Sequence, residues 1–94
     1  MSLAIHKYPI TLQPALAGIS HVTLPKGAKI LHASDQRGEF KIWAIVDLEE
    51  KAVETRHFLV LGTGQKFDRA DSVHLEHIST VLSGMYVWHI FEWL

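Results

Sequence analysis

Histidine is the residue type with the widest chemical scope in this sequence, because imidazole can bind a metal ion or move a proton near neutral pH. The 94 residues include seven histidines and no cysteine. Only one short segment, residues 74–77, places two histidines beside a carboxylate, that of Glu76. On a strand His74 and His77 point to opposite faces and cannot share a metal ion, whereas a helix would bring them to one face. Residues 70–82 fit either structure; we favour a strand and therefore predict no metal site and no cofactor.

The sequence offers no recognisable catalytic motif. A chain without cysteine has neither a thiol nucleophile nor a thiolate metal site. Serine, histidine and aspartate are all present, but the Gly-x-Ser-x-Gly pattern that exposes a nucleophilic serine is absent. We therefore predict that the protein is not an enzyme, and we name no catalytic residue.

Residues 62–66 read Gly-Thr-Gly-Gln-Lys and superficially resemble a phosphate-binding loop. Such a loop needs four residues between its glycines and a serine or threonine directly after the lysine. Here one residue separates the glycines and Phe67 follows the lysine, so we expect a turn that opens the longest irregular stretch, residues 62–72. A long loop can still contact a partner, and the candidates for such contact are Gly62, Thr63, Gly64 and Lys66.

Short strands must position these residues. Apolar runs of about 6–10 residues, rich in β-branched and aromatic residues, are separated by glycine or proline, which is typical of an all-β sandwich or barrel. We expect strands at residues 4–8, 19–24, 28–35, 39–48, 53–61, 73–82 and 85–93, and assign no structure to the segment between Ile10 and Gly18. The prediction is one all-β domain over residues 1–94, an antiparallel small barrel or sandwich of about six to seven short strands with little or no helix. Residues 1–3 could derive partly from cloning, so none of the expectations drawn from the sequence depends on them.

Two tight turns are expected to form hairpins. Residues 35–38 read Asp-Gln-Arg-Gly, with an aspartate suited to start a turn and a glycine where a positive φ is least costly. Ser83 and Gly84 separate the last two apolar runs and fit a two-residue loop, which would pair Leu82 with Met85. The last two strands would then be adjacent and antiparallel.

Strand 39–48 alternates between a core face and a face of mixed character. The core face consists of Phe40, Ile42, Ala44 and Val46. The other face carries Trp43 and Ile45 between charged residues. In the final hairpin, by contrast, both faces would be apolar.

A sheet that is apolar on both faces needs cover on both, and a chain of 94 residues with little helix has few elements to provide it. Uncovered apolar patches commonly mark interaction sites, so we expect a homo-oligomer that also binds an unknown protein partner. The alternative is that strand 85–93 is simply the central strand of a well-filled sandwich. The interface candidates are Trp43, Ile45, Phe58, Trp88, Ile90, Phe91 and Trp93.

The overall charge argues against binding to nucleic acid. Nine Lys and Arg residues stand against ten Asp and Glu, which gives a formal net charge of −1, whereas a nucleic-acid clamp needs a basic surface. Trp43 and Phe58 could still stack bases in a small barrel, so binding of nucleic acid or a small ligand stays as the alternative function. No apolar stretch has the length of a membrane span, and we expect no membrane association.

Several short motifs occur in an order that resembles a known group of proteins. They are Lys7-Tyr8-Pro9-Ile10, Leu24-Pro25-Lys26-Gly27-Ala28-Lys29-Ile30-Leu31, Ile42-Trp43-Ala44-Ile45-Val46-Asp47, Arg56-His57-Phe58, Gly62-Thr63-Gly64 and Val87-Trp88-His89-Ile90-Phe91-Glu92. Their order and spacing, over nearly the whole chain, resemble a family of short uncharacterised proteins of bacteriophages, prophages and their bacterial hosts. The resemblance implies a compact, β-rich accessory protein of the bacterial cytoplasm, and it implies no activity. The sequence thus predicts a non-enzymatic β domain that works by homo-oligomerisation and protein binding.

Overall fold

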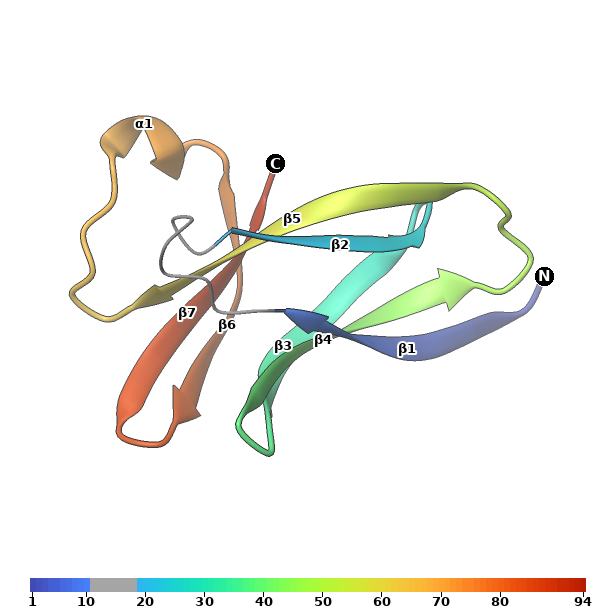
Figure 1. Cartoon of the computed structure of the whole chain (residues 1–94). Helices are drawn as coiled ribbons and strands as arrows, with labels where there is room; N and C mark the ends of the chain where they lie inside the picture. The colour runs from blue at the N-terminus through green and yellow to red at the C-terminus, as the bar shows by residue number, and fades with distance from the viewer. Residues whose placement is uncertain (11–18) are drawn as a thin grey trace.

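The computed structural model describes residues 1–10 and 19–94, and this part of the chain contains seven strands and one short helix (Figure 1). In chain order they are β1 (Leu3–Ile10), β2 (Ile19–Pro25), β3 (Lys29–Gln36), β4 (Glu39–Asp47), β5 (Val53–Gly62), α1 (Arg69–Ser72), β6 (Leu75–Ser83) and β7 (Tyr86–Trp93). All seven predicted strands are present, with ends that differ from the prediction by no more than two residues. The segment between Ile10 and Gly18, to which the sequence assigns no structure, lies outside the described residues.

The strands form two antiparallel sheets, one with the order β1-β4-β3 and one with the order β2-β5-β7-β6. β2 contacts β1 and β4, and β3 contacts β6, so the two sheets face each other. Figure 1 shows β2 and β5 passing across the sheet that holds β1 and β4. The described strands do not close into a barrel. The all-β prediction is confirmed, and of its two alternatives the sandwich is the arrangement observed.

The core lies between the sheets and takes one face of each strand. On β4 the four residues predicted for the core face are all buried: Phe40, Ile42, Ala44 and Val46. The other sheet contributes Leu24, Phe58, Val60, Val81 and Ile90, among others. Strict alternation along β4 is therefore explained by one face in the core and one face turned outward.

Side-chain hydrogen bonds join β3 to β6, the neighbouring edges of the two sheets. The backbone N–H of Ala33 donates to Ser79 Oγ at 3.0 Å. Ser83 Oγ donates to Asp35 Oδ2 at 2.9 Å. These bonds hold the two edges together without a backbone ladder between them.

Arg56 and Glu92 form a largely buried ion pair on the inner side of the four-stranded sheet. Nε and Nη2 of Arg56 donate to Oε2 and Oε1 of Glu92 at 2.6 and 2.7 Å, and Nη1 donates to the backbone oxygen of Ala28. The hydrogen bond to Glu92 raises the pKa of Arg56 above its ordinary value, although burial acts in the opposite direction. Arginine therefore keeps its charge in the fold, and removal of Glu92 would take away its two short hydrogen bonds and leave the longer ion pair with Glu54, at 3.7 Å.

The first predicted hairpin is confirmed, although its turn spans residues 36–39 and so begins one residue later than expected. Arg37 and Gly38 connect β3 and β4, and Gln36 pairs with Glu39 on either side of them. Both loop residues have a positive φ, 55° for Arg37 and 85° for Gly38. Two consecutive positive φ angles are the requirement of a type I′ turn, whose twist matches that of the strands.

The final hairpin is also present, but the predicted loop was displaced by one residue. Gly84 and Met85 form the loop, and Ser83 pairs with Tyr86. Gly84 has a φ of 61°, which is the conformation that the first position of such a loop needs and that glycine adopts without strain. The predicted pairing of Leu82 with Met85 is therefore wrong.

A bulge then changes which residues of β6 share a face. The register shifts between His77 and Ser79, so that His77 pairs with Phe91 and Leu75 pairs with Trp93. An extra residue in one strand turns the following side chains over. Leu75 and His77 consequently lie on the outer face, whereas an unbroken register would have put them on the core face with Ser79 and Val81.

Residues 70–82 contain both structures that the sequence left open. One helical turn, α1, ends at Ser72, and β6 begins at Leu75. The strand that we favoured is confirmed over most of the segment. Among the described residues, no helix has the length and apolar character that would carry it across a membrane.

Candidate functional site

The outer face of the three-stranded sheet, turned away from the core, carries exposed apolar side chains. We call it the three-strand face, and its apolar members are Leu3, Ile5, Trp43 and Ile45. Leu31 lies at the bulge of β3, next to His32, the ladder partner of Trp43. Ile5 lies opposite Ile45 in the ladder between β1 and β4. Leu3 is 59% exposed, Ile5 61% and Leu31 41%. The described part of the chain therefore leaves this apolar row largely open to water.

Trp43 lies at the centre of the three-strand face, between basic residues. Its ladder partners are Lys7 on β1 and His32 on β3, and the ring centroids of Trp43 and His32 are 6.4 Å apart. Farther along β4, Lys41 Nζ lies 3.0 Å from Glu39 Oε2 in an ion pair. The apolar row is thus bordered by charges of both signs, as is usual at the rim of a protein interface.

Three of the predicted interface residues point inward. Phe58 and Ile90 are completely buried between the sheets, so their assignment to an interface is wrong. The reason is that the inner rows of β5 and β7 face the other sheet. Trp88 packs against the core as well, with its ring centroid 6.0 Å from that of Phe40.

The outer face of the four-stranded sheet, which we call the four-strand face, is partly covered by the chain itself. Leu59 and Leu61 point away from the core, yet each is only 5% exposed. Residues 65–68 and Asp71 line an open cavity of about 740 Å³ together with both leucines, Ile19 and Trp93. Figure 1 shows the loop with α1 standing beside that end of the sheet. The irregular stretch predicted as a partner contact therefore acts, in part, as cover for its own sheet.

The two remaining interface candidates, Phe91 and Trp93, lie on the four-strand face and are half-buried. The His74 ring stacks on Trp93 with a centroid distance of 5.0 Å, and the His77 ring meets Phe91 edge-on at 5.4 Å. These histidines reduce the exposure of both aromatic rings. A partner contact at Phe91 and Trp93 stays a prediction.

The candidate loop residues lie at the start of residues 62–72, which we call the covering segment. The backbone N–H of Gln65 donates to Gly62 O at 3.0 Å across a turn in which Gly64 has a φ of 87°. The Thr63 hydroxyl lies 2.7 Å from His89 Nε2 on the neighbouring strand. A side chain on Gly62 would stand 3.3 Å from the Trp88 ring, so glycine suits this close approach. Lys66 lines the covered cavity and is exposed, and contact of these four residues with a partner stays a prediction.

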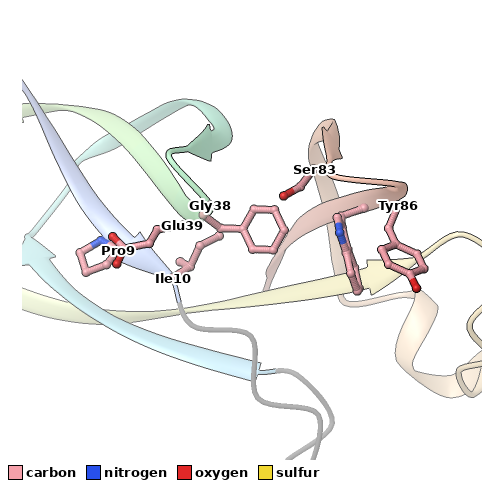
Figure 2. A pocket seen from close by; sticks show the side chains of 8 residues that line it. Pro9, Ile10, Gly38, Glu39, Ser83 and Tyr86 are labelled. Atoms are coloured by element: carbon pink, nitrogen blue, oxygen red, sulfur yellow. The ribbon is translucent and has the colours of Figure 1, made fainter.

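A second cavity, of about 460 Å³, opens between the tips of the two hairpins. Figure 2 shows Pro9, Ile10 and Glu39 on one side of it and Ser83 and Tyr86 on the other. The cavity is lined mainly by apolar and aromatic groups, and its one carboxylate is the Glu39 group already paired with a lysine. Because its one carboxylate is paired, the described residues that line the cavity offer no free carboxylate for acid–base chemistry.

Four histidines lie on the strands of the four-strand face: His21, His57, His77 and His89. The Nδ1 atoms of His21 and His57 are only 2.6 Å apart. Within residues 1–10 and 19–94, no three metal-ligating side chains converge. Sequence reasoning missed the His21–His57 pair because 36 residues separate its members and only the pairing of β2 with β5 brings them together.

Comparison with known proteins places the chain in a defined family. A family model described as "Domain of unknown function (DUF7352)" matches residues 1–93. No curated protein and no solved structure matches the chain. The expected resemblance to a family without an assigned function is confirmed to that extent.

Proposed function

The chain belongs to the DUF7352 family, and we propose that it is a non-enzymatic β domain that binds a second copy of itself through the three-strand face. The observation that carries this proposal is the exposed pair Leu3 and Ile5 beside Trp43 and Ile45 on one face of the three-stranded sheet, with exposed Leu31 at the bulge of β3. Burial of an exposed leucine or isoleucine side chain is favourable by about 1.5–3 kcal/mol. Several such side chains together can drive association.

The charges around the row support a second copy as the occupant. Lys29 and Lys41 border it together with Glu39 and Asp47, all on β3 and β4. A two-fold dimer brings the same patch together from both subunits, so a patch with both signs can pair with itself. A uniformly basic or acidic rim would repel its own copy instead.

A side-chain pair that resembles a catalytic serine and histidine is held by a structural hydrogen bond, which supports a non-enzymatic role. Ser79 Oγ lies 3.2 Å from His32 Nδ1, which places a serine hydroxyl beside a possible base. The same oxygen accepts the backbone N–H of Ala33, and Ser79 is buried. A serine held in this way joins the sheet edges and has no access to a substrate.

The test is the mass of the protein in solution, measured by light scattering at low micromolar concentration. We expect at least twice the chain mass of 10.6 kDa. Trp43→Lys and Ile5→Lys should each return the mass toward that of one chain, because each places a charge in the apolar row. Leu82→Lys is the matched control, since Leu82 is also exposed but lies on the four-strand face.

Two results would overturn the proposal. One is a wild-type mass near 10.6 kDa that does not change on tenfold concentration. The other is dissociation by Leu82→Lys but by neither variant of the three-strand face. Circular dichroism of each variant separates dissociation from unfolding.

Single-stranded nucleic acid is the second candidate for the same face, because Trp43 and the lysines beside it resemble a base-stacking platform. Two observations weaken it: Phe58, the other predicted stacking residue, is buried, and Lys41 is paired with Glu39. Retention on single-stranded DNA at low salt that is lost in Trp43→Ala would favour this candidate. Absence of retention at low salt would remove it.

The cellular setting that we propose is the cytoplasm of a bacterial host, with an accessory role for a bacteriophage or prophage and an unknown protein as a further partner. The support is the resemblance of the short sequence motifs to phage and prophage proteins. Finding the coding sequence among phage genes, and the protein in the cytoplasmic fraction of its host, would test this setting directly.

A further inference from the structure

We propose that His21 and His57 bind a divalent late first-row metal ion, with Cu²⁺ bound most tightly, through their two Nδ1 atoms. The ladder between β2 and β5 places the two residues directly opposite each other. Their Nδ1 atoms lie 2.6 Å apart and their rings are nearly perpendicular, at 87°. In the absence of metal, one neutral ring donates its N–H and the other accepts it. A metal ion would take the place of this proton, which moves through water to Nε2 of the same ring.

The distance between the nitrogens favours a tetragonal ion over a tetrahedral one. With metal–nitrogen bonds of about 2.0–2.1 Å, neighbouring nitrogens at a right angle are about 2.9 Å apart and at a tetrahedral angle about 3.3 Å. From 2.6 Å, the first arrangement needs only a small opening of the pair. Imidazole nitrogens in tetragonal geometry suit Cu²⁺ and Ni²⁺, and Cu²⁺ has the highest affinity among the divalent ions of this series.

The surroundings of the pair can accept a cation. The strands β2, β6 and β7 contain no lysine or arginine, and the one arginine of β5 points to the core and is paired with Glu92. On one side of the pair lie the hydroxyls of Thr23 and Thr55, 3.2 Å apart. His21 is exposed, so water can fill the other coordination positions. The site would hold one ion per chain.

A second pair of histidines on the same face does not converge and provides the matched control. His77 Nε2 and His89 Nδ1 both bind Thr80 Oγ1, at 3.0 and 3.1 Å. The hydroxyl therefore stands between the two imidazoles. If histidine content alone attracted metal, this pair would bind as well as the first.

The experiment is a calorimetric titration of the full-length, tag-free chain with Cu²⁺, and separately with Zn²⁺. We expect one Cu²⁺ per chain, a weaker Zn²⁺ complex, and an electron paramagnetic resonance spectrum with coupling to nitrogen. His21→Gln and His57→Gln should each lower the Cu²⁺ affinity by at least about tenfold, since each removes one of two protein ligands. The variant with both His77→Gln and His89→Gln should bind within about twofold of the wild type.

Wild-type Cu²⁺ affinity and nitrogen coupling in both single variants would overturn the proposal, as would an equal loss in the control variant. Circular dichroism in the presence of a chelator establishes that all variants are folded. The site lies on the opposite sheet from the proposed dimer face, so the Trp43→Lys variant should bind Cu²⁺ like the wild type whether or not the chain dimerises.

Discussion

The outer faces of the two sheets carry similar apolar side chains but differ in what covers them. On the four-strand face, Leu61 is 5% exposed, whereas on the three-strand face Ile5 is 61% exposed. Residues 65–68 and Asp71 contribute to the difference, because they surround Leu59 and Leu61 together with Ile19 and Trp93. The same kind of side chain is thus buried within the chain on one sheet and left open on the other.

This difference shows how little regular structure is needed to cover a sheet. The covering segment has a single helical turn, α1, with no buried residue of its own. It is held by a tight turn at Gly64 and by the contact of Thr63 with His89. A group of apolar side chains on the outer face of a sheet therefore indicates that something packs on them. It does not indicate whether what packs there belongs to the same chain or to another molecule.

The largest effect should come from Leu61→Ala, which tests the covered face. Truncation of a buried leucine removes its burial and leaves a cavity, with a typical cost of about 2–5 kcal/mol in the free energy of unfolding. Since the cover of Leu61 is part of the same chain, this loss should not vary with protein concentration. Urea unfolding at two concentrations measures it. A loss below about 0.5 kcal/mol would mean that the segment does not cover Leu61 in solution.

A smaller effect should come from Thr63→Val, which keeps the shape of the side chain and removes its hydroxyl. The variant loses the contact with His89 Nε2 at 2.7 Å, and a hydrogen bond of this kind contributes about 0.5–1.5 kcal/mol. Hydrogen exchange should become faster at the covering segment and remain unchanged on β1. Uniformly faster exchange in both sheets would instead indicate a general loss of stability.

The fold was largely predictable because its signals are local. Alternation along β4 and the turn residues at Arg37 and Gly38 depend on neighbours in the sequence. The pairing of the last hairpin was not predictable in full, because two loops that differ by one residue both fit the sequence around Gly84, and because the register then shifts between His77 and Ser79. The ion pair between Arg56 and Glu92 was missed because two strands far apart in the chain must first be placed side by side.

The candidate surface was only partly predictable. Alternation correctly identified Trp43 and Ile45 as outward-facing, because β4 has one buried face. The same reasoning failed for Phe58 and Ile90. Both faces of β5 and β7 carry apolar side chains, and only the packing of one sheet on the other decides which face is buried. The His21–His57 pair was also missed, because nothing near either histidine in the sequence indicates which residue lies opposite it.

The smallest effect on a single chain should come from Leu3→Ala, the matched partner of Leu61→Ala on the other face. Leu3 is 59% exposed, so the truncation should cost less than about 0.5 kcal/mol when the protein is dilute enough to be monomeric. If a second copy covers the three-strand face, association stabilises the wild type more as concentration rises. The difference between wild type and variant should then grow toward about 1–2 kcal/mol at high concentration. A difference that is the same at all concentrations would mean that Leu3 contacts no second copy, and a difference as large as that of Leu61→Ala at low concentration would mean that its own chain covers it.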